Sequence, residues 1–342
     1  GTHGKSTTTA MISHALLVCG ADPSFVVGGT VPQLGGGSRS GKGSAFVAEA
    51  CEYDRSFHNL RPRIAIITNI EEDHLDCYKD IHQIVESFRT FGRLVPDDGL
   101  IIANGADHNV RETLADSTNR LEWVGTDDGW QIKPTGLVNG CHTGEIRFGG
   151  KFFCTIQLSV PGAHNLTNAT MAIAACRACG IDPQQAADAI GTFRGVDRRM
   201  MEMGTVNGAM VVDDYGHHPT EIRATLAALR ERYQPRRLIC VFQPHQHSRT
   251  RFLLEDFAAS FSAADQTIVP DIYFVRDSEA ERQRVSSGDL VNRINQAGQQ
   301  ALHLREFEQI VEHLKDEARP GDLIVTMGAG NVWEIGRDLV SN

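Results

Sequence analysis

The segment Gly-Thr-His-Gly-Lys-Ser-Thr at residues 1–7 has the composition of a phosphate-binding loop. Gly1 and Gly4 let backbone N–H groups approach phosphate oxygens, and a helix beginning at Lys5 would add the partial positive charge of its N-terminus. Lys5 would reach the β- and γ-phosphates of a nucleotide, and the Ser6 hydroxyl would bind Mg²⁺. The alternative is an ordinary glycine-rich turn before a helix. Because such a loop normally follows a buried strand, we expect the chain to be a fragment of a longer protein.

Two acidic segments follow apolar runs that predict buried strands. Glu49 is the first carboxylate after the run 45–47, and His74 lies among carboxylates after the run 64–67. Ligands in doubly wound sheets gather at the carboxyl ends of the strands, so we expect both side chains near the phosphate loop. Glu49 would hold Mg²⁺, and His74 would be a second metal ligand or a charge-stabilised imidazolium. The alternatives are a solvated acidic loop around Glu49 and surface ion pairing of His74.

Asn165 and Asn168 lie three residues apart at the start of a predicted helix and therefore share a face. Side-chain amides there suit a purine edge or a phosphate, and helix capping is the alternative. Arg199 lies at the predicted boundary between two domains. It would clamp a transferring phosphoryl group when the domains close, or else form an interdomain salt bridge.

The second half of the chain carries two segments rich in His, Tyr and Arg, each after a predicted strand. They are Asp-Tyr-Gly-His-His-Pro-Thr-Glu at 214–221 and Phe-Gln-Pro-His-Gln-His-Ser-Arg-Thr-Arg at 242–251. Strand ends are the expected place for a substrate pocket. The four histidines lack the spacing of a zinc site, so zinc is not expected.

The order of apolar runs and helical patterns predicts an α/β fold with mostly parallel sheets. In the first half we expect helices at 5–19, 81–95, 165–179 and 183–192, strands at 25–27, 45–47, 64–67 and 100–103, a glycine-rich loop at 28–43 and a small antiparallel insert at 121–158. In the second half we expect strands at 209–212, 238–242, 267–269, 301–304 and 323–326, and helices at 220–233, 251–264, 290–297, 307–315 and 331–339. The predicted domains are 1–198, which carries the phosphate loop and which we expect to bind the nucleotide, and 199–342.

The composition of the 342 residues is globular and acidic, with 33 basic and 43 acidic residues and a formal net charge of −10. This charge argues against a protein that coats duplex nucleic acid. No apolar run reaches the length of a membrane span, and no signal-peptide pattern opens the chain. We expect a soluble cytoplasmic protein that binds neither nucleic acid nor membrane, and its oligomeric state stays open.

Taken in order along the chain, these segments resemble the Mur ligase family, the ATP-dependent amide-forming enzymes of peptidoglycan synthesis. The resemblance covers essentially all of the chain. It implies a P-loop-type ATPase domain with a small antiparallel insert, followed by a Rossmann-like α/β domain, with the family's N-terminal UDP-binding domain absent. The residues that carry it are Gly1, Thr2, His3, Gly4, Lys5, Ser6, Thr7, Glu49, Thr68, Asn69, His74, Asn165, Asn168, Arg199 and Asp214.

The resemblance implies a role for each matched position. Residues 1–7, and Lys5 in particular, would bind the phosphates of ATP. Ser6 and Glu49 would hold one Mg²⁺, and His74 would hold a second Mg²⁺ near the acyl phosphate. Other ATP contacts would come from Asn165, Asn168, Arg199 and Asp214, with Lys5, Glu49, His74 and Arg199 taking part in catalysis. The muramoyl and amino-acid side would be lined by Tyr215, His217, His245 and Arg249.

Within the family, the segments 214–221, 242–251 and 327–331 are most similar to the branch that joins L-alanine to UDP-N-acetylmuramate. The implied reaction phosphorylates the lactyl carboxylate with ATP, and the amine of L-alanine then attacks the acyl phosphate. Three alternatives remain: a ligase of the same family that recycles murein tripeptide, a plain phosphoryl transferase, and an ATP-binding fragment without ligase activity.

Overall fold

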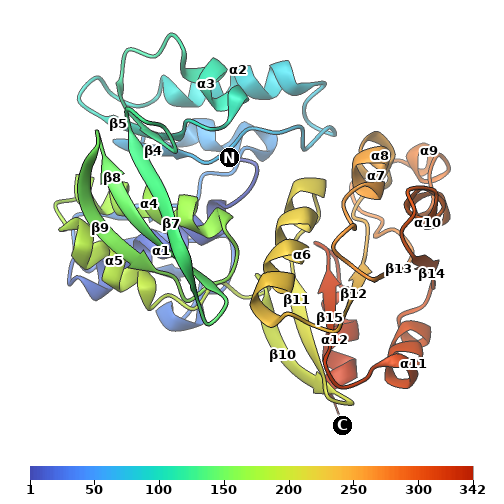
Figure 1. The fold of residues 1–342 in the computed structure, drawn as a ribbon. Helices are drawn as coiled ribbons and strands as arrows, with labels where there is room; N and C mark the ends of the chain where they lie inside the picture. The colour runs from blue at the N-terminus through green and yellow to red at the C-terminus, as the bar shows by residue number, and fades with distance from the viewer. Residues whose placement is uncertain (342) are drawn as a thin grey trace. The chain divides into compact units, whose positions relative to one another are not determined.

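The computed structural model describes residues 1–341, and the chain divides into two compact units, Gly1–Asp197 and Arg198–Asn342. These limits differ by one residue from the predicted domains. Both units are mixed α/β structures with mainly parallel sheets, as the sequence predicts (Figure 1). No helix within residues 1–341 is long and apolar enough to cross a membrane.

The first unit is built on a six-stranded sheet of order β4-β5-β6-β7-β8-β9 and a separate three-stranded sheet of order β2-β1-β3. Strands β4 to β7 run parallel, and β7, β8 and β9 are antiparallel hairpin strands. The strands are β1 (Ser24–Val26), β2 (Ser38–Arg39), β3 (Phe46–Ala48), β4 (Ile64–Ile67), β5 (Leu100–Asn104), β6 (Arg120–Val124), β7 (Trp130–Val138), β8 (Cys141–Phe148) and β9 (Lys151–Gln157).

Helices cover both faces of the six-stranded sheet. Alternate residues of β5 show this, because they pack into two different hydrophobic cores. Leu100 and Ile102 lie in the core with α1, α4 and α5, whereas Ile101 and Ala103 lie in the core with α2 and α3. The helices are α1 (Lys5–Val18), α2 (Ile81–Gly92), α3 (His108–Leu114), α4 (His164–Ala178) and α5 (Pro183–Gly191), with 3-10 turns η1 (Pro32–Leu34) and η2 (Tyr53–Asn59).

The second unit has one continuous six-stranded sheet of order β10-β11-β15-β12-β13-β14, parallel except for the β10–β11 pair. Central strand β15 is buried along its whole length. The strands are β10 (Met201–Val206), β11 (Ala209–Asp214), β12 (Arg237–Phe242), β13 (Gln266–Val269), β14 (Ala301–His303) and β15 (Asp322–Met327). The helices are α6 (Pro219–Tyr233), α7 (His247–Phe252), α8 (Leu254–Ala258), α9 (Glu279–Arg282), α10 (Ser287–Gln296), α11 (Phe307–Glu317) and α12 (Trp333–Val340).

Three details differ from the sequence prediction. Strands β7–β9 are antiparallel to one another, as predicted for 121–158, and extend the edge of the main sheet, but β6 in the same range pairs in parallel with β5. The glycine-rich segment 28–43 contains η1 and β2 in addition to loop. The helix predicted at 251–264 is wrong: α7 and α8 replace it, starting earlier and interrupted at Leu253, whose backbone is not helical.

Candidate active site

The loop at residues 1–4 meets the N-terminus of α1, and both of its glycines are sterically required. Gly4 precedes the helix with φ +78°, a left-handed conformation that favours glycine. A Cβ on Gly4 would lie 2.8 Å from the Asn168 side-chain oxygen, and a Cβ on Gly1 would lie 2.0 Å from Thr68 Oγ1. The loop therefore presents bare backbone at a helix N-terminus, which is the geometry of an anion site.

The Thr68-Asn69 pair at the end of β4 braces this loop. The Asn69 side-chain oxygen accepts from His3 N at 2.7 Å, and the Asn69 backbone oxygen accepts from Thr2 N at 3.1 Å. Thr68 Oγ1 donates to the His3 carbonyl at 2.6 Å. Residues from the carboxyl end of one strand thus fix the conformation of a loop more than sixty residues away in sequence.

Lys5 forms a buried ion pair with Glu52, a residue that the sequence analysis did not select. Lys5 Nζ lies 2.8 Å from Glu52 Oε1 and also donates to the carbonyls of Gly1 and Thr2. Burial alone would lower the pKa of Lys5, but the Glu52 carboxylate outweighs it and raises that pKa. Burial would raise the pKa of Glu52, but the Lys5 charge outweighs it and lowers that pKa to about 2. Lys5 is therefore charged and held in place.

Ser6 and Glu49 form a second pair beside the loop. Ser6 Oγ donates to Glu49 Oε1 at 2.9 Å, and Gly28 N donates to Glu49 Oε2 at 2.6 Å. A Cβ on Gly28 would lie 2.8 Å from the same carboxylate, so a larger residue there would displace the Glu49 side chain. A hydroxyl and a carboxylate are oxygen donors of the kind that Mg²⁺ binds.

His74 lies against the Lys5–Glu52 pair. Its Nε2 is 3.7 Å from Glu52 Oε1 and 3.7 Å from Asp73 Oδ2, and its ring contacts Tyr53 edge-on at 5.1 Å between centroids. Its backbone is left-handed, with φ +54°. Lys5, Ser6, Glu49 and His74 thus lie around the same loop, and Glu52 contacts both Lys5 and His74.

Asn165 and Asn168 lie in the first turns of α4 and are linked to each other. Asn168 Nδ2 donates to Asn165 Oδ1 at 2.9 Å, and Asn165 Nδ2 donates to the Pro161 carbonyl at 2.7 Å. Both side chains are buried. Because Asn168 lies directly against Gly4, this pair supports the phosphate loop from the other side.

In the second unit, the four residues predicted to contact substrate form one cluster at the ends of β11 and β12. The His217 ring lies edge-on to Tyr215 at 5.4 Å and to His245 at 6.2 Å between centroids. Arg249 Nη1 is 3.1 Å from His245 Nδ1. Tyr273, which the sequence analysis missed, stacks on His245 at 5.5 Å.

Arg199 and Asp214 also lie in the second unit, where both make internal contacts. Arg199 is 3.5 Å from Glu221 and lies over the Tyr215 ring. Asp214 accepts hydrogen bonds from Met200 N, Gly216 N and Thr225 Oγ1. Burial raises the pKa of Asp214. Asp214 therefore fixes the turn that carries Tyr215 and His217.

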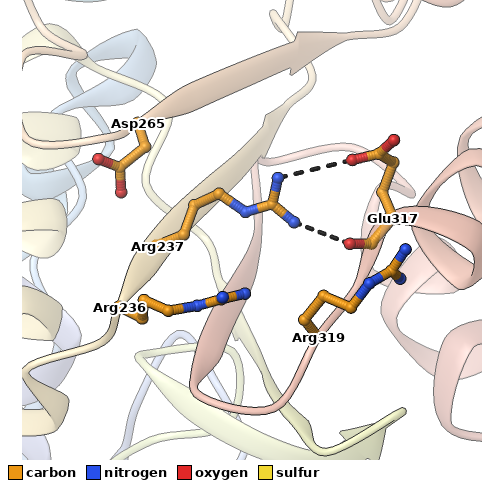
Figure 2. Close-up of a pocket in the computed structure, with 5 residues that line it drawn as sticks. All are labelled: Arg236, Arg237, Asp265, Glu317 and Arg319. Atoms are coloured by element: carbon orange, nitrogen blue, oxygen red, sulfur yellow. Dashed lines mark hydrogen bonds and ion pairs between the residues drawn. The ribbon is translucent and has the colours of Figure 1, made fainter.

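A different charged region lies at the opposite end of the same sheet, where β12 and β15 begin. Figure 2 shows Arg236, Arg237 and Arg319 with Asp265 and Glu317 around a cavity of about 470 Å³. Two of the arginines are paired with one carboxylate: Asp322, at the start of β15, lies 3.1 Å from Arg236 and 2.8 Å from Arg237. We call these residues the arginine pocket.

Comparison with known proteins gives a consistent result for both units. Residues 1–176 match the family model "Mur ligase middle domain", and residues 198–330 match "Mur ligase, glutamate ligase domain". UDP-N-acetylmuramate–L-alanine ligase of Caldanaerobacter subterraneus subsp. tengcongensis is 44% identical over 339 residues, covering 98% of this chain and 73% of the relative. The enzyme of the same name from Acetivibrio thermocellus is 42% identical over 340 residues, covering 98% and 72%.

Solved structures of Mur ligases are also similar to this chain. The crystal structure of the UDP-N-acetylmuramate–alanine ligase MurC of Thermotoga maritima has a TM-score of 0.80 at 25% identity and covers 99% of this chain and 73% of that one. A murein peptide ligase from Psychrobacter arcticus has a TM-score of 0.71 at 29% identity and covers 99% and 75%. With both family models matched and the phosphate loop, Glu49 and His74 gathered in one site, the chain belongs to the Mur ligase family.

Proposed function

We propose that this chain carries the ATPase and amide-forming machinery of a ligase that joins L-alanine to the lactyl carboxylate of UDP-N-acetylmuramate. Relatives of that name at 40–44% identity support the substrates. The observation that carries the chemistry is the gathering of Lys5, the Ser6–Glu49 pair and His74 around one loop.

The reaction requires two steps, and the loop residues suit the first. A carboxylate oxygen attacks the γ-phosphorus of ATP, the bond to the β-phosphate oxygen breaks, and ADP leaves with an acyl phosphate formed. The attacking carboxylate and the phosphates are all negative, so fixed positive charge is needed to offset their repulsion. Lys5 supplies that charge, and the glycines let backbone N–H groups approach the phosphate oxygens.

In the second step the amine nitrogen of L-alanine attacks the acyl carbon, phosphate leaves and the amide remains. Water has to be excluded, because it would hydrolyse the acyl phosphate. The cluster of Tyr215, His217, His245 and Arg249 is our candidate for the muramoyl and amino-acid side. Its aromatic rings and its guanidinium suit a sugar face and a carboxylate respectively.

Mg²⁺ fits the donor set beside the loop. Ser6 Oγ and one Glu49 oxygen are already adjacent, and Glu52 Oε2 is buried without a hydrogen-bond partner among the described residues. We propose that Ser6 and Glu49 hold one ion and that His74 is a ligand of a second one. When bound, Mg²⁺ supplies charge neutralisation at the phosphates. We also keep the proposal that four further residues contact ATP: Asn165, Asn168, Arg199 and Asp214.

The test is phosphate release measured with ATP, UDP-N-acetylmuramate and one acceptor at a time. Release that depends on L-alanine, together with the mass of the amide product, is the expected result. Release that depends on murein tripeptide instead would favour the recycling ligase, which the likeness to the Psychrobacter arcticus enzyme makes the second candidate. Release with an acceptor hydroxyl would indicate a phosphoryl transferase, and ATP binding without turnover would indicate a binding fragment.

A further inference from the structure

Arg198 begins the second unit, and its side chain reaches the ends of two strands. Its Nε donates to Asp213 Oδ2 at 3.0 Å, and its Nη2 donates to the Gly328 carbonyl at 2.8 Å. Asp213 lies near the end of β11, and Gly328 directly follows β15. Because β11 and β15 are parallel neighbours in the sheet, the guanidinium ties their carboxyl ends together.

A third contact of Arg198 is with Tyr215, a member of the substrate cluster. Arg198 Cζ lies 5.1 Å from the centre of the Tyr215 ring, within the range of a cation–π interaction. The Tyr215 backbone N donates to the Arg198 carbonyl at 2.7 Å. Arg198 therefore holds Tyr215 through its side chain as well as through its backbone.

The carboxylate that binds Arg198 is itself buried and fixed. Asp213 is 0% exposed, and its Oδ1 accepts from Thr326 Oγ1 at 2.8 Å. Burial raises the pKa of the Asp213 carboxyl, and the Arg198 charge opposes that rise. Because Asp213 is anchored through both of its oxygens, the guanidinium paired with it is also held in place.

The turn after β15 is packed tightly against the neighbouring strand ends. Gly328 has φ +148°, and a Cβ there would lie 2.7 Å from the Gln243 backbone oxygen at the end of β12. Gly328 N also donates to the Asp214 carbonyl at 3.0 Å. Arg198 thus accepts no freedom from this turn: it binds the first carbonyl of a segment that is fixed on both sides.

A second arginine of the same unit forms a comparable ion pair without the aromatic contact. Arg237 lies 2.8 Å from Asp322, and the side-chain exposures of the two residues are 29% and 0%, against 24% and 0% for Arg198 and Asp213. Arg237 lies in the arginine pocket, at the opposite end of the sheet from the substrate cluster (Figure 2). The two pairs therefore have similar burial, and the Tyr215 ring distinguishes Arg198.

We propose that Arg198 is a positioning residue, which fixes the Tyr215 ring toward the substrate by binding Asp213 and the Gly328 carbonyl at the same time. An arginine suits this task because its planar fork donates in two directions, whereas the ammonium of lysine is a point charge. The inference rests on the proposed function, since it takes Tyr215 to face the muramoyl and amino-acid side. The orientation of the ring can nevertheless be measured without any substrate.

The first test is fluorine NMR of the full chain labelled with 3-fluorotyrosine. The chain has five tyrosines, and the Tyr215 signal is assigned with Tyr215→Phe. In Arg198→Gln the Tyr215 signal is expected to move toward its position in the urea-unfolded chain. In the matched control Arg237→Gln it is expected to stay in place. A Tyr215 signal that does not move in Arg198→Gln would overturn the inference, whatever substrates the protein takes.

A second variant separates positioning from stability. Arg198→Gln leaves the Asp213 carboxylate buried and unpaired, which is destabilising. The double variant Arg198→Gln with Asp213→Asn removes that charge, so its melting temperature should recover while the Tyr215 signal stays displaced. Recovery of both the melting temperature and the signal would show that the pair serves stability alone and would reject the positioning role.

Steady-state kinetics then connects the ring to the substrate. In Arg198→Gln and in the double variant, the KM for UDP-N-acetylmuramate or L-alanine should rise on the order of tenfold with the KM for ATP unchanged, and Arg198→Lys should give a smaller rise. A displaced Tyr215 signal with unchanged KM values would also overturn the inference. Absence of turnover by the wild type with every acceptor would instead contradict the proposed function, and the fluorine measurement would still test whether Arg198 holds the ring.

Discussion

The phosphate loop and the arginine pocket both concentrate charge, yet only one of them has the architecture of a nucleotide site. At the loop, one lysine and two carboxylates surround bare glycine backbone at a helix N-terminus and at the carboxyl ends of parallel strands. In the arginine pocket, Arg236 and Arg237 at the amino end of β12 are paired with Asp322, and the Arg319 guanidinium donates to the backbone carbonyls of Asp316 and Ala318. For nucleotide binding, the end of the sheet at which the charged residues lie is therefore more important than how many charges are present.

The largest effect is expected for Lys5→Ala. This change removes the positive charge that offsets repulsion in phosphoryl transfer, so turnover should fall on the order of 10³-fold. It also leaves Glu52 buried and unpaired, which is destabilising. The double variant Lys5→Ala with Glu52→Gln controls for that loss of stability. Phosphate release is the measurement, and near-normal release from a folded Lys5→Ala protein would reject the role of Lys5.

The second-largest effect is expected for Glu49→Gln. The amide oxygen can still accept from Gly28 N, and the amide NH₂ can donate to Ser6 Oγ, but the charge is lost. The Mg²⁺ concentration needed for half-maximal turnover should therefore rise on the order of 10²-fold. A titration of turnover with Mg²⁺, and of Mn²⁺ binding by electron paramagnetic resonance, measures it. Glu112→Gln, at an exposed position of α3, is the matched control. Equal metal dependence in the two variants would remove Glu49 from the metal site.

Glu52→Gln tests the role of the buried carboxylate that pairs with Lys5. A neutral side chain of the same shape can still accept from Lys5 but no longer fixes its charge or the position of His74, so kcat should fall roughly 10-fold. The KM for ATP should change less. Steady-state kinetics separates the two constants, and Glu52→Asp tests for partial rescue. An unchanged kcat would mean that the buried pair serves stability alone.

His245→Gln should have a smaller and more selective effect. The ring lies between His217 and Tyr273 in the cluster proposed to face the sugar and the amino acid. Loss of this stacking should raise the KM for UDP-N-acetylmuramate or L-alanine roughly 10-fold, which corresponds to about 1.4 kcal/mol of binding free energy. The KM for ATP serves as the internal control. A rise confined to ATP would contradict the assignment.

Asp322→Asn in the arginine pocket should leave turnover unchanged. Burial would raise the pKa of Asp322, but hydrogen bonds from Arg237 and Arg236 outweigh it and lower that pKa. A lowered pKa contributes stability above the ordinary carboxyl pKa, and that stability is lost as the pH falls through the folded value. The variant should therefore melt about 3 °C lower at pH 7 and lose less stability than the wild type below pH 4. Parallel melting curves at every pH would argue against this pairing.

The sequence predicts the strands and the loop of this site but not the residue at its centre. Strand β4 and helix α1 follow from an apolar run and a glycine-rich motif, which are local signals. Glu49 was selected because it is the first carboxylate after its strand, and it does reach Ser6. Glu52 lies beyond it, where turn η2 has left-handed backbone at Asp54 and Arg55, and pairs with a lysine 47 residues earlier.

Long-range packing explains the other differences as well. The hairpin strands β7–β9 have the alternating pattern of an antiparallel unit, but the pattern does not say which sheet they join. Tyr273 reaches His245 only because the segment after β13 folds back over the end of β12, a contact between residues 28 positions apart. Both facts depend on tertiary packing instead of local propensity.

Calorimetric titration of Mg²⁺-ATP into three forms of the protein tests the central claim most directly. The forms are the wild type, Lys5→Ala and Arg236→Ala, the last removing an arginine from the pocket at the amino ends of the strands. The account predicts that the wild type and Arg236→Ala bind alike and that Lys5→Ala loses measurable binding. Full binding by Lys5→Ala together with loss of binding by Arg236→Ala would place the nucleotide in the arginine pocket of the second unit, and that result would contradict the account.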